Sequence, residues 1–234
     1  VSGFNAAQIS NLSTTQVAAL ETQDLAALSP SQFSALRSSQ IQALSTDQIA
    51  SLKNTQLQNL ASTNVSAMST AQVAAITTSQ LQVFNTAQIA ALSSAQIGGM
   101  GTDQIKGIKS NLIAAINTGA IAGLTSAQLS AMSTAQIVQI SSQQLGAFST
   151  EQIAAISTDD VGALTGRQIS AMSTTQMRAL TTNQIVALKP SQVVSIPTQS
   201  MAALDGDQVA AFTAAQVAYL TSSQMGSLTS DQIG

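Results

Sequence analysis

The sequence predicts an all-α solenoid built from very short helices, one for every eight residues. Three observations predict it: an uninterrupted octapeptide repeat, a helix-start pattern inside each octad, and only two large apolar side chains per octad. From Asn5 to Leu228 the chain of 234 residues divides into 28 complete octads without insertion or deletion. Two apolar side chains cannot offset the entropy of ordering eight residues, so we expect the octads to stack and share one core.

Each octad is defined by apolar fifth and eighth places and a fourth-place glutamine. In the octad Ser45–Leu52 these are Ile49, Leu52 and Gln48. The fifth and eighth places are apolar in all 28 octads, and we expect the fifth, seventh and eighth places to be buried. The fourth place is Gln in 22 octads, and the exceptions are Asp24, Asn64, Leu112, Ala120, Asp160 and Ser200.

The spacing of the apolar places requires a break in every octad. Separations of three and then five residues fit neither a continuous helix nor a continuous strand. The phrase L-S-T-D-Q-I from Leu44 to Ile49 supplies the break as a capping box. Ser45 is the expected N-cap, Gln48 reaches back from the third helical position, and Leu44 faces Ile49. The cap place holds Ser, Thr, Asn or Asp in 20 of 28 octads.

Prolines and charges agree with this frame. Pro30 and Pro190 fall at the first helical position, where proline is tolerated because its missing N–H has no partner within the helix. Acids recur at the second helical position, near the positive end of the helix dipole, and cations recur at the cap place. The acids are Asp47, Asp103, Glu151, Asp159, Asp207 and Asp231, and the cations are Arg37, Lys53, Lys109 and Lys189.

A weaker alternation between neighbouring octads predicts the size of one coil. The fifth place is Ile in 9 of 14 octads of the series that starts at Asn5, and in 3 of 14 of the others. Alternate octads would therefore sit in different environments, so we expect two octads, or sixteen residues, per coil. A β-solenoid, in which Ile, Val, Ser and Thr form ladders, is the alternative fold.

The repeat covers the whole chain, so we expect residues 1–234 to form a single continuous solenoid. Val1–Phe4 read as the last half of an octad and Thr229–Gly234 as the first part of another. We therefore expect the chain to be a fragment of a longer repeat array.

Composition argues against several classes of function. Charged residues make up 7% of the chain, the net charge is −3, and Cys, His and Trp are absent. Scattered single charges favour neither nucleic acid nor an anionic membrane, and no apolar run is long enough for membrane insertion. Without imidazole or thiol groups we expect no enzyme, no catalytic or cofactor-binding residues and no cofactor.

The close carboxylate pairs do not predict a metal site. Asp159 with Asp160, and Asp205 with Asp207, are the only such pairs. Neither is accompanied by the glycine and distal glutamate of a calcium loop, so we expect acids at helix starts and no metal.

The octads of this chain resemble those of a known group of proteins. Leu44–Leu52 (L-S-T-D-Q-I-A-S-L), Ser69–Ile76 and Thr181–Leu188 are similar to the "LTxxQIxAL" octads of long repetitive bacterial surface and secreted proteins. Those proteins are often described as adhesins or haem-utilisation proteins. The resemblance implies an extracellular or cell-surface protein that is filamentous or stalk-like; the haem description finds no support, because the chain has no His.

A shorter likeness exists to the first helix of the DNA-reading repeats of TAL effectors. Those repeats are about twice as long as the sixteen-residue unit and carry a base-reading loop that this chain lacks. The likeness indicates only that the phrase can be helical.

Together these observations predict a structural protein. We expect a rod, a stalk or a subunit of an extracellular filament that binds copies of itself through a stacked apolar core. The alternative is an adhesin-type binding module, which would recognise a glycan, ice or a host surface through a face of Ser, Thr and Gln side chains.

Overall fold

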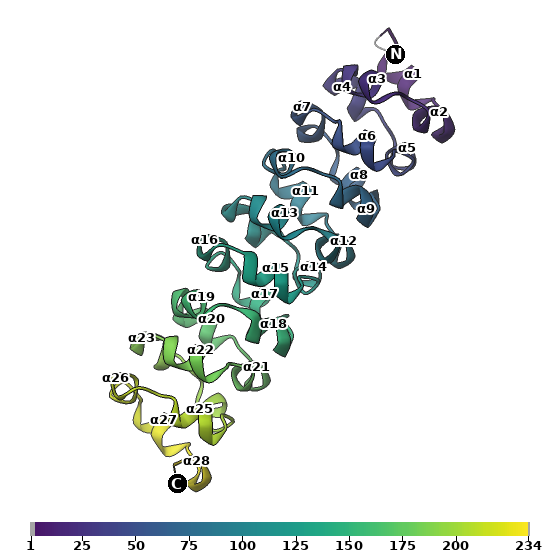
Figure 1. The fold of residues 1–234 in the computed structure, drawn as a ribbon. Coiled ribbons are helices and arrows are strands. Elements are labelled where there is room, and N and C mark those ends of the chain that lie inside the picture. Colours follow the sequence, from purple (N-terminus) through teal and green to yellow (C-terminus); the bar gives the residue numbers. More distant parts are fainter. Residues whose placement is uncertain (1–2, 234) are drawn as a thin grey trace. The chain divides into compact units, whose positions relative to one another are not determined.

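The computed structural model describes residues 3–233, and Val1, Ser2 and Gly234 lie outside the described residues. The described part contains 28 α-helices and one 3₁₀ helix, and it contains no strand (Figure 1). The prediction of an all-α solenoid of very short helices is confirmed, and the β-solenoid alternative is wrong. Each helix has only four to six residues, because a new cap residue ends it within one octad.

The chain divides into two compact units, Val1–Gly123 and Leu124–Gly234. We describe each by itself, and the expected continuity of one solenoid over residues 1–234 stays a prediction. The helices of the first unit are α1 (Ala6–Ser10), α2 (Thr14–Ala18), α3 (Thr22–Ala27), α4 (Pro30–Ser34), α5 (Ser38–Gln42), α6 (Thr46–Ala50), α7 (Asn54–Gln58), α8 (Ser62–Ala67), α9 (Thr70–Ala74), α10 (Thr78–Leu81), α11 (Thr86–Ala90), α12 (Ser94–Gly99), α13 (Thr102–Gly107), the 3₁₀ helix η1 (Ser110–Ala115) and α14 (Thr118–Ile121).

The second unit repeats the same architecture. Its helices are α15 (Ser126–Ala131), α16 (Thr134–Ile137), α17 (Ser142–Gly146), α18 (Thr150–Ala155), α19 (Thr158–Ala163), α20 (Gly166–Ser170), α21 (Thr174–Arg178), α22 (Thr182–Ala187), α23 (Pro190–Val193), α24 (Thr198–Met201), α25 (Gly206–Ala210), α26 (Ala214–Val217), α27 (Ser222–Gly226) and α28 (Ser230–Ile233).

The predicted capping box forms at most helix starts. Before α6 the backbone N–H of Ser45 donates to Gln48 Oε1 at 2.8 Å, and the N–H of Gln48 donates to Ser45 Oγ at 3.1 Å. Where a cation occupies the cap place only the glutamine half remains, as in the bond of 2.9 Å from Lys53 N to Gln56 Oε1. Pro30 and Pro190 begin α4 and α23, as expected.

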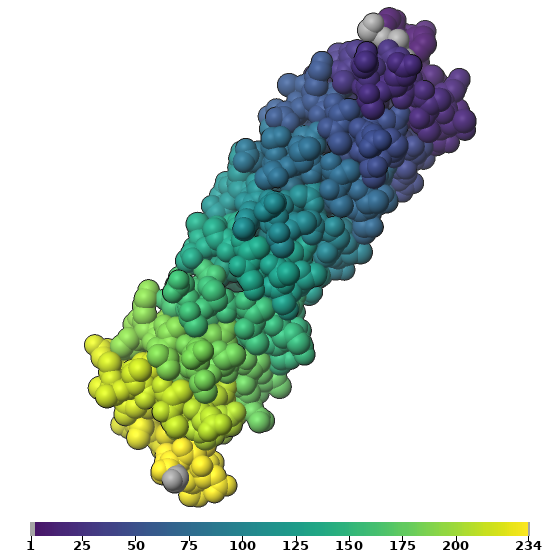
Figure 2. Space-filling model, in the orientation of Figure 1, coloured from purple at the N-terminus to yellow at the C-terminus, as the bar shows by residue number. Residues whose placement is uncertain are grey.

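Within each unit, helices that are three octads apart pack against one another. In the first unit α2 contacts α5, and α5 contacts α8; in the second unit α19 contacts α16 and α22. Stacked helices are thus three octads apart, which is 24 residues. Within each unit of Figure 2 the colours follow one another in chain order, as expected where each turn contacts only neighbouring turns.

The predicted sixteen-residue coil is wrong. Helices three octads apart are stacked, and hydrogen bonds reach 28 and 31 residues back, so one turn takes between three and four octads. The alternation of neighbouring octads in the frequency of Ile at the fifth place has no counterpart in these contacts. The octad pattern itself is compatible with any number of octads per turn, because the same places face inwards in each case.

The core is formed by the fifth and eighth places. Ile49 and Leu52, for example, are fully or almost fully buried. The expected burial of the seventh place is wrong, because residues such as Ala43 and Ser51 are half-exposed. The fourth place is buried in its stead, since its glutamine connects successive turns.

Candidate functional site: the glutamine contacts between turns

The fourth-place glutamine is both a helix cap and a bridge to the preceding turn. Gln72 accepts a bond of 2.8 Å from Ser69 N through Oε1. Its Nε2 donates to the carbonyl oxygens of Ile41 at 2.8 Å, Gln42 at 3.2 Å and Leu44 at 2.7 Å. For a fourth-place residue i, we call the carbonyl oxygens of residues i−31, i−30 and i−28 its acceptor site.

The same geometry recurs in the second unit. Gln184 Nε2 lies 3.0 Å from Ile153 O, 3.3 Å from Ala154 O and 2.7 Å from Ile156 O. These three carbonyls end a short helix and have no N–H partner four residues further on, so the amide supplies the missing donor. One uncharged side chain therefore satisfies groups on two turns at once.

The burial of the glutamines argues against one part of the alternative function, namely the participation of Gln side chains in a binding face. A binding face of Ser, Thr and Gln would need the amides to point outwards, but the fourth-place glutamines between Gln40 and Gln224 are almost completely buried. The first two, Gln8 and Gln16, are exposed, and their side chains form the hydrogen bonds of the capping box. The remaining outward polar surface is formed mainly by Ser and Thr.

Two octads without glutamine keep a donor at the acceptor site by other means. Asn64 Nδ2 donates to Leu36 O at 3.0 Å, which lies 28 residues earlier. In the octad of Ala120 the cap residue takes over: Asn117 Oδ1 accepts from Ala120 N at 2.8 Å, and its Nδ2 donates to Leu92 O at 3.1 Å. Sequence reasoning missed this second role of Asn117, although an Asn cap in an octad without Gln was a signal.

The octad of Leu112 changes its local structure. Lys109 offers no side-chain cap bond, and Leu112 cannot reach back to the backbone as Gln does. This octad forms the 3₁₀ helix η1, with a bond of 2.9 Å from Leu112 N to Lys109 O. A 3₁₀ turn is the usual result where helix ends lack capping partners.

Asp160 and Ser200 occupy the fourth place of two octads in the second unit and supply no such donor. Both side chains are almost fully buried, and among the described residues Asp160 Oδ1 and Ser200 Oγ have no hydrogen-bond partner. Asp160 Oδ2 accepts from Ser157 Oγ at 2.6 Å. The predicted carboxylate pair is thereby split, because Asp159 is exposed while Asp160 points inwards.

The other acids sit at helix starts as expected. Asp205 Oδ1 accepts from Gln208 N at 2.8 Å, and Asp207 follows in the first turn of α25. A backbone hydrogen bond and bonds with Ser149 and Thr150 lower the pKa of the exposed Glu151 carboxyl. Within residues 3–233 no three acidic side chains come together as a metal site would require.

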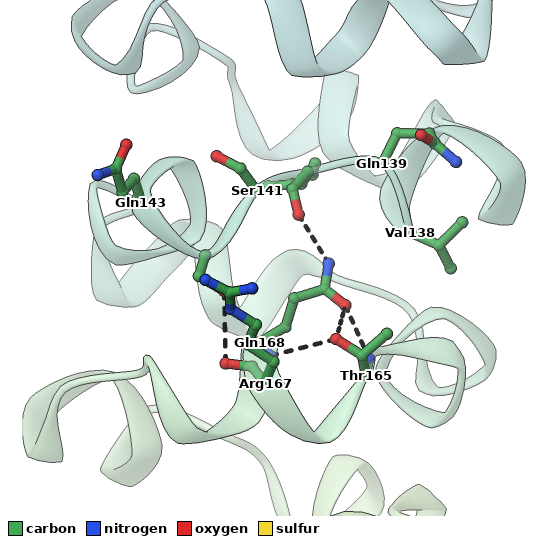
Figure 3. Close-up of a pocket in the computed structure, with 9 residues that line it drawn as sticks. Val138, Gln139, Ser141, Gln143, Thr165, Arg167 and Gln168 are labelled. Carbon is green, nitrogen blue, oxygen red and sulfur yellow. Dashed lines mark hydrogen bonds between the residues drawn. The ribbon is translucent and has the colours of Figure 1, made fainter.

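Two of the hollows on the surface of the second unit bear on its function. The larger, of about 540 Å³, is lined by Val138–Gln143, Thr165, Arg167 and Gln168. Figure 3 shows Gln168 at its floor, where Nε2 donates to Ile140 O at 2.8 Å. The hollow offers one cation and several amides and hydroxyls, and no base beside a nucleophile.

The smaller hollow, of about 170 Å³, lies at the last octads and is apolar. Its lining residues are Met201, Val209, Phe212, Val217, Leu220, Met225, Leu228 and Ile233. Val217, Met225 and Ile233 are fifth-place residues, and here they are exposed. In the octads up to that of Met201 the fifth-place side chain is buried, because the following turn packs over it. The hollow is therefore formed by core residues that no following turn covers.

Comparison with known proteins rests on the repeat. A family model described as the ALTTAQ repeat matches residues 17–54, 73–110, 121–166, 137–174, 167–198 and 201–234. Ala67–Gln72 and Ala131–Gln136, which both read A-M-S-T-A-Q, show how the octad corresponds to that name. The chain belongs to the ALTTAQ repeat family. No curated protein matches it. The tandem repeat expected from the resemblance is thus confirmed.

In the ALTTAQ motif, the second Thr begins the helix and the final Gln is the bridging residue.

No helix within residues 3–233 has both the length and the apolar character needed to cross a membrane.

Proposed function

We propose that this ALTTAQ repeat protein is a structural element, namely a rod, a stalk or a subunit of an extracellular bacterial filament that associates with copies of itself. The observation that supports it is the contact between turns. The glutamine amides of one turn donate hydrogen bonds to carbonyl oxygens of the preceding turn. The carbonyl oxygens and the apolar fifth-place side chains of the same turn are covered by the following turn.

The surfaces at the first and the last octads support self-association. Gln8 and Gln16 expose their amides in the first unit, while Met225 and Ile233 expose apolar fifth-place side chains in the second. Any octads of the same pattern fit these surfaces, whether in the same chain or in another. For the 234-residue chain by itself, the proposed occupant is a second copy, which would make a head-to-tail, non-closing contact.

The chemistry of the chain suits this role outside the cell. The glutamine contacts between turns use amides and carbonyls and depend little on salt, because these groups carry no charge. The proposal includes no catalytic activity, no cofactor and no partner among nucleic acids or membranes.

Sedimentation velocity over a range of protein concentrations, with electron microscopy of the same samples, tests the proposal. We expect end-to-end assemblies that grow with concentration. Met225→Asp should abolish them, because it places a charge in the apolar hollow. Val186→Asp is the matched control: Val186 is 50% exposed and Met225 is 47% exposed, but Val186 does not line this hollow. A wild-type chain that stays monomeric at millimolar concentration would contradict the proposal.

An adhesin-type module is the second candidate, and the hollow in Figure 3 is the observation that favours it. Arg167, the exposed Gln139 and Gln143 and the half-buried Ser142 line it, and they could bind the hydroxyls or carboxylate of a glycan. A glycan array comparing the wild type with Arg167→Ala tests this candidate. Binding that the substitution abolishes would support it.

A further inference from the structure

Asp160 places a carboxylate where the rest of the repeat places an amide. The side chain is 4% exposed, and Oδ1 is buried without a hydrogen-bond partner. The other oxygen, Oδ2, accepts the hydroxyl hydrogen of Ser157 at 2.6 Å. One carboxylate oxygen is therefore satisfied locally, and the other is not.

From the spacing in the other octads we infer which carbonyl oxygens Oδ1 faces. By the spacing of 31, 30 and 28 residues, the acceptor site of Asp160 consists of the carbonyl oxygens of Leu129, Ser130 and Met132. Asn64 has the same length as Asp160, and its Nδ2 reaches the carbonyl that lies 28 residues earlier at 3.0 Å. A carboxylate has no hydrogen to donate, so at Asp160 acceptors face acceptors.

The helix that supplies these carbonyls adds to the negative potential. Leu129, Ser130 and Met132 lie at the C-terminal end of α15, where the helix dipole is negative and cations are favoured. No cation of the described protein forms an ion pair with Asp160 Oδ1, which has no partner. A buried charge without a partner is costly, so the site has a need for positive charge.

We propose that the acceptor site of Asp160 binds a monovalent cation of ammonium size, such as K⁺ or NH₄⁺. The ligands are Asp160 Oδ1 and the carbonyl oxygens of Leu129, Ser130 and Met132. One positive charge neutralises one carboxylate, whereas a divalent ion would leave a surplus charge buried.

The dimensions of the site also favour this class of ion. At regular acceptor sites of the second unit the amide nitrogen lies 2.6 Å from Leu124 O, 2.8 Å from Ile140 O and 3.0 Å from Ile153 O. These distances scatter around the roughly 2.7–2.9 Å of the charge-assisted N–H···O bonds that an ammonium ion forms. All three exceed the roughly 2.0–2.1 Å of Mg²⁺, and two of the three exceed the roughly 2.3–2.6 Å of Ca²⁺. Backbone carbonyls are also the ligands that replace the hydration shell of K⁺ in selective pores.

Ser200 provides a comparison within the same unit. It too is buried at the fourth place without a partner, but its side chain carries no charge. Its acceptor site, which includes the carbonyl of Met172, therefore lacks the electrostatic attraction, and we expect no ion there.

Thermal unfolding of the 234-residue chain in different chloride salts at equal ionic strength tests the proposal. The wild type should melt several degrees higher in 0.2 M KCl or NH₄Cl than in tetramethylammonium chloride, because an ion that binds only the folded chain stabilises it. Asp160→Asn and Asp160→Gln should show no such difference, since each supplies its own donor. Asp159→Asn, a change in the exposed neighbour, should keep the full difference.

Crystals soaked in RbCl give an independent readout. An anomalous peak beside Asp160 Oδ1, absent from the Asp160→Asn crystals and from the site of Ser200, would support the proposal.

Three results would overturn it: equal melting in all salts, a salt difference that survives Asp160→Asn, or a shift produced by CaCl₂ alone.

Discussion

The two units differ in what replaces a missing fourth-place glutamine. In residues 3–123 the octads of Asn64 and Ala120 keep a donor at the acceptor site, through Asn64 itself and through Asn117. In residues 124–233 the octads of Asp160 and Ser200 leave buried oxygens without a partner. The difference teaches that the donor at an acceptor site need not be the fourth-place glutamine, and that the octads of Asp160 and Ser200 fold although their fourth-place side chains donate no hydrogen bond.

The most severe way to break a regular acceptor site is to remove its glutamine. Gln176→Leu deletes bonds of 2.9 Å from Ser173 N, 2.9 Å to Leu145 O and 2.8 Å to Phe148 O. We expect a loss of about 3 kcal/mol in unfolding free energy, because buried groups on two turns lose their partners. Urea denaturation followed by circular dichroism measures it.

Gln16→Leu is the control for that change. Gln16 is exposed and its capping bonds are with Ser13, so the expected loss is below about 1 kcal/mol. Equal losses for Gln16→Leu and Gln176→Leu would show that capping alone, and not the contact between turns, accounts for the glutamines.

The substitute donor of the first unit can be tested separately from its capping role. Asn117→Asp keeps an oxygen for Ala120 N but removes the donor to Ala90 O and Leu92 O, so we expect a loss of about 2 kcal/mol. Asn85→Asp is the matched control, because Gln88 already serves the acceptor site of that octad. Urea midpoints that fall equally for both variants would rule out the second role of Asn117.

The capping contribution by itself is smaller. Ser45→Ala removes the acceptor of Gln48 N and leaves the contacts of Gln48 with the preceding turn, so we expect a loss of about 1 kcal/mol. Lys53→Ala, at a cap place without a side-chain cap bond, should change the unfolding free energy by less than about 0.5 kcal/mol. An equal loss of unfolding free energy for Ser45→Ala and Gln176→Leu would contradict the expectation that capping contributes less than the contact between turns.

The smallest effect concerns pH. Hydrogen bonds lower the pKa of Glu151 in the folded chain, so its stabilising contribution is present above the ordinary pKa and is lost as pH falls below about 4.5. Glu151→Gln should therefore flatten the acid side of the stability profile slightly. Melting temperatures of both proteins between pH 3 and pH 6 check this, and parallel curves would contradict it.

The helix starts were predictable from the sequence because capping is local. Ser45 and Gln48 are three residues apart, and their reciprocal bonds need no knowledge of the fold. The same holds for Pro30 and Pro190 at the first helical position.

The length of a turn and the bridging role of glutamine were not predictable in the same way. The capping box uses Gln48 Oε1, and its sequence pattern predicts no partner for Gln48 Nε2. The partners of Nε2 lie 28 and 30 residues earlier. For the same reason Asp160 resembled an ordinary acid at a helix start, and only its packed position reveals the oxygen without a partner.

Hydrogen exchange of the glutamine side-chain amides, resolved by NMR, tests the central claim most directly. If each buried amide bridges two turns, the Nε2 hydrogens of Gln72 and Gln184 exchange orders of magnitude more slowly than those of Gln8 and Gln16. Uniformly fast exchange of all four amides would contradict the account.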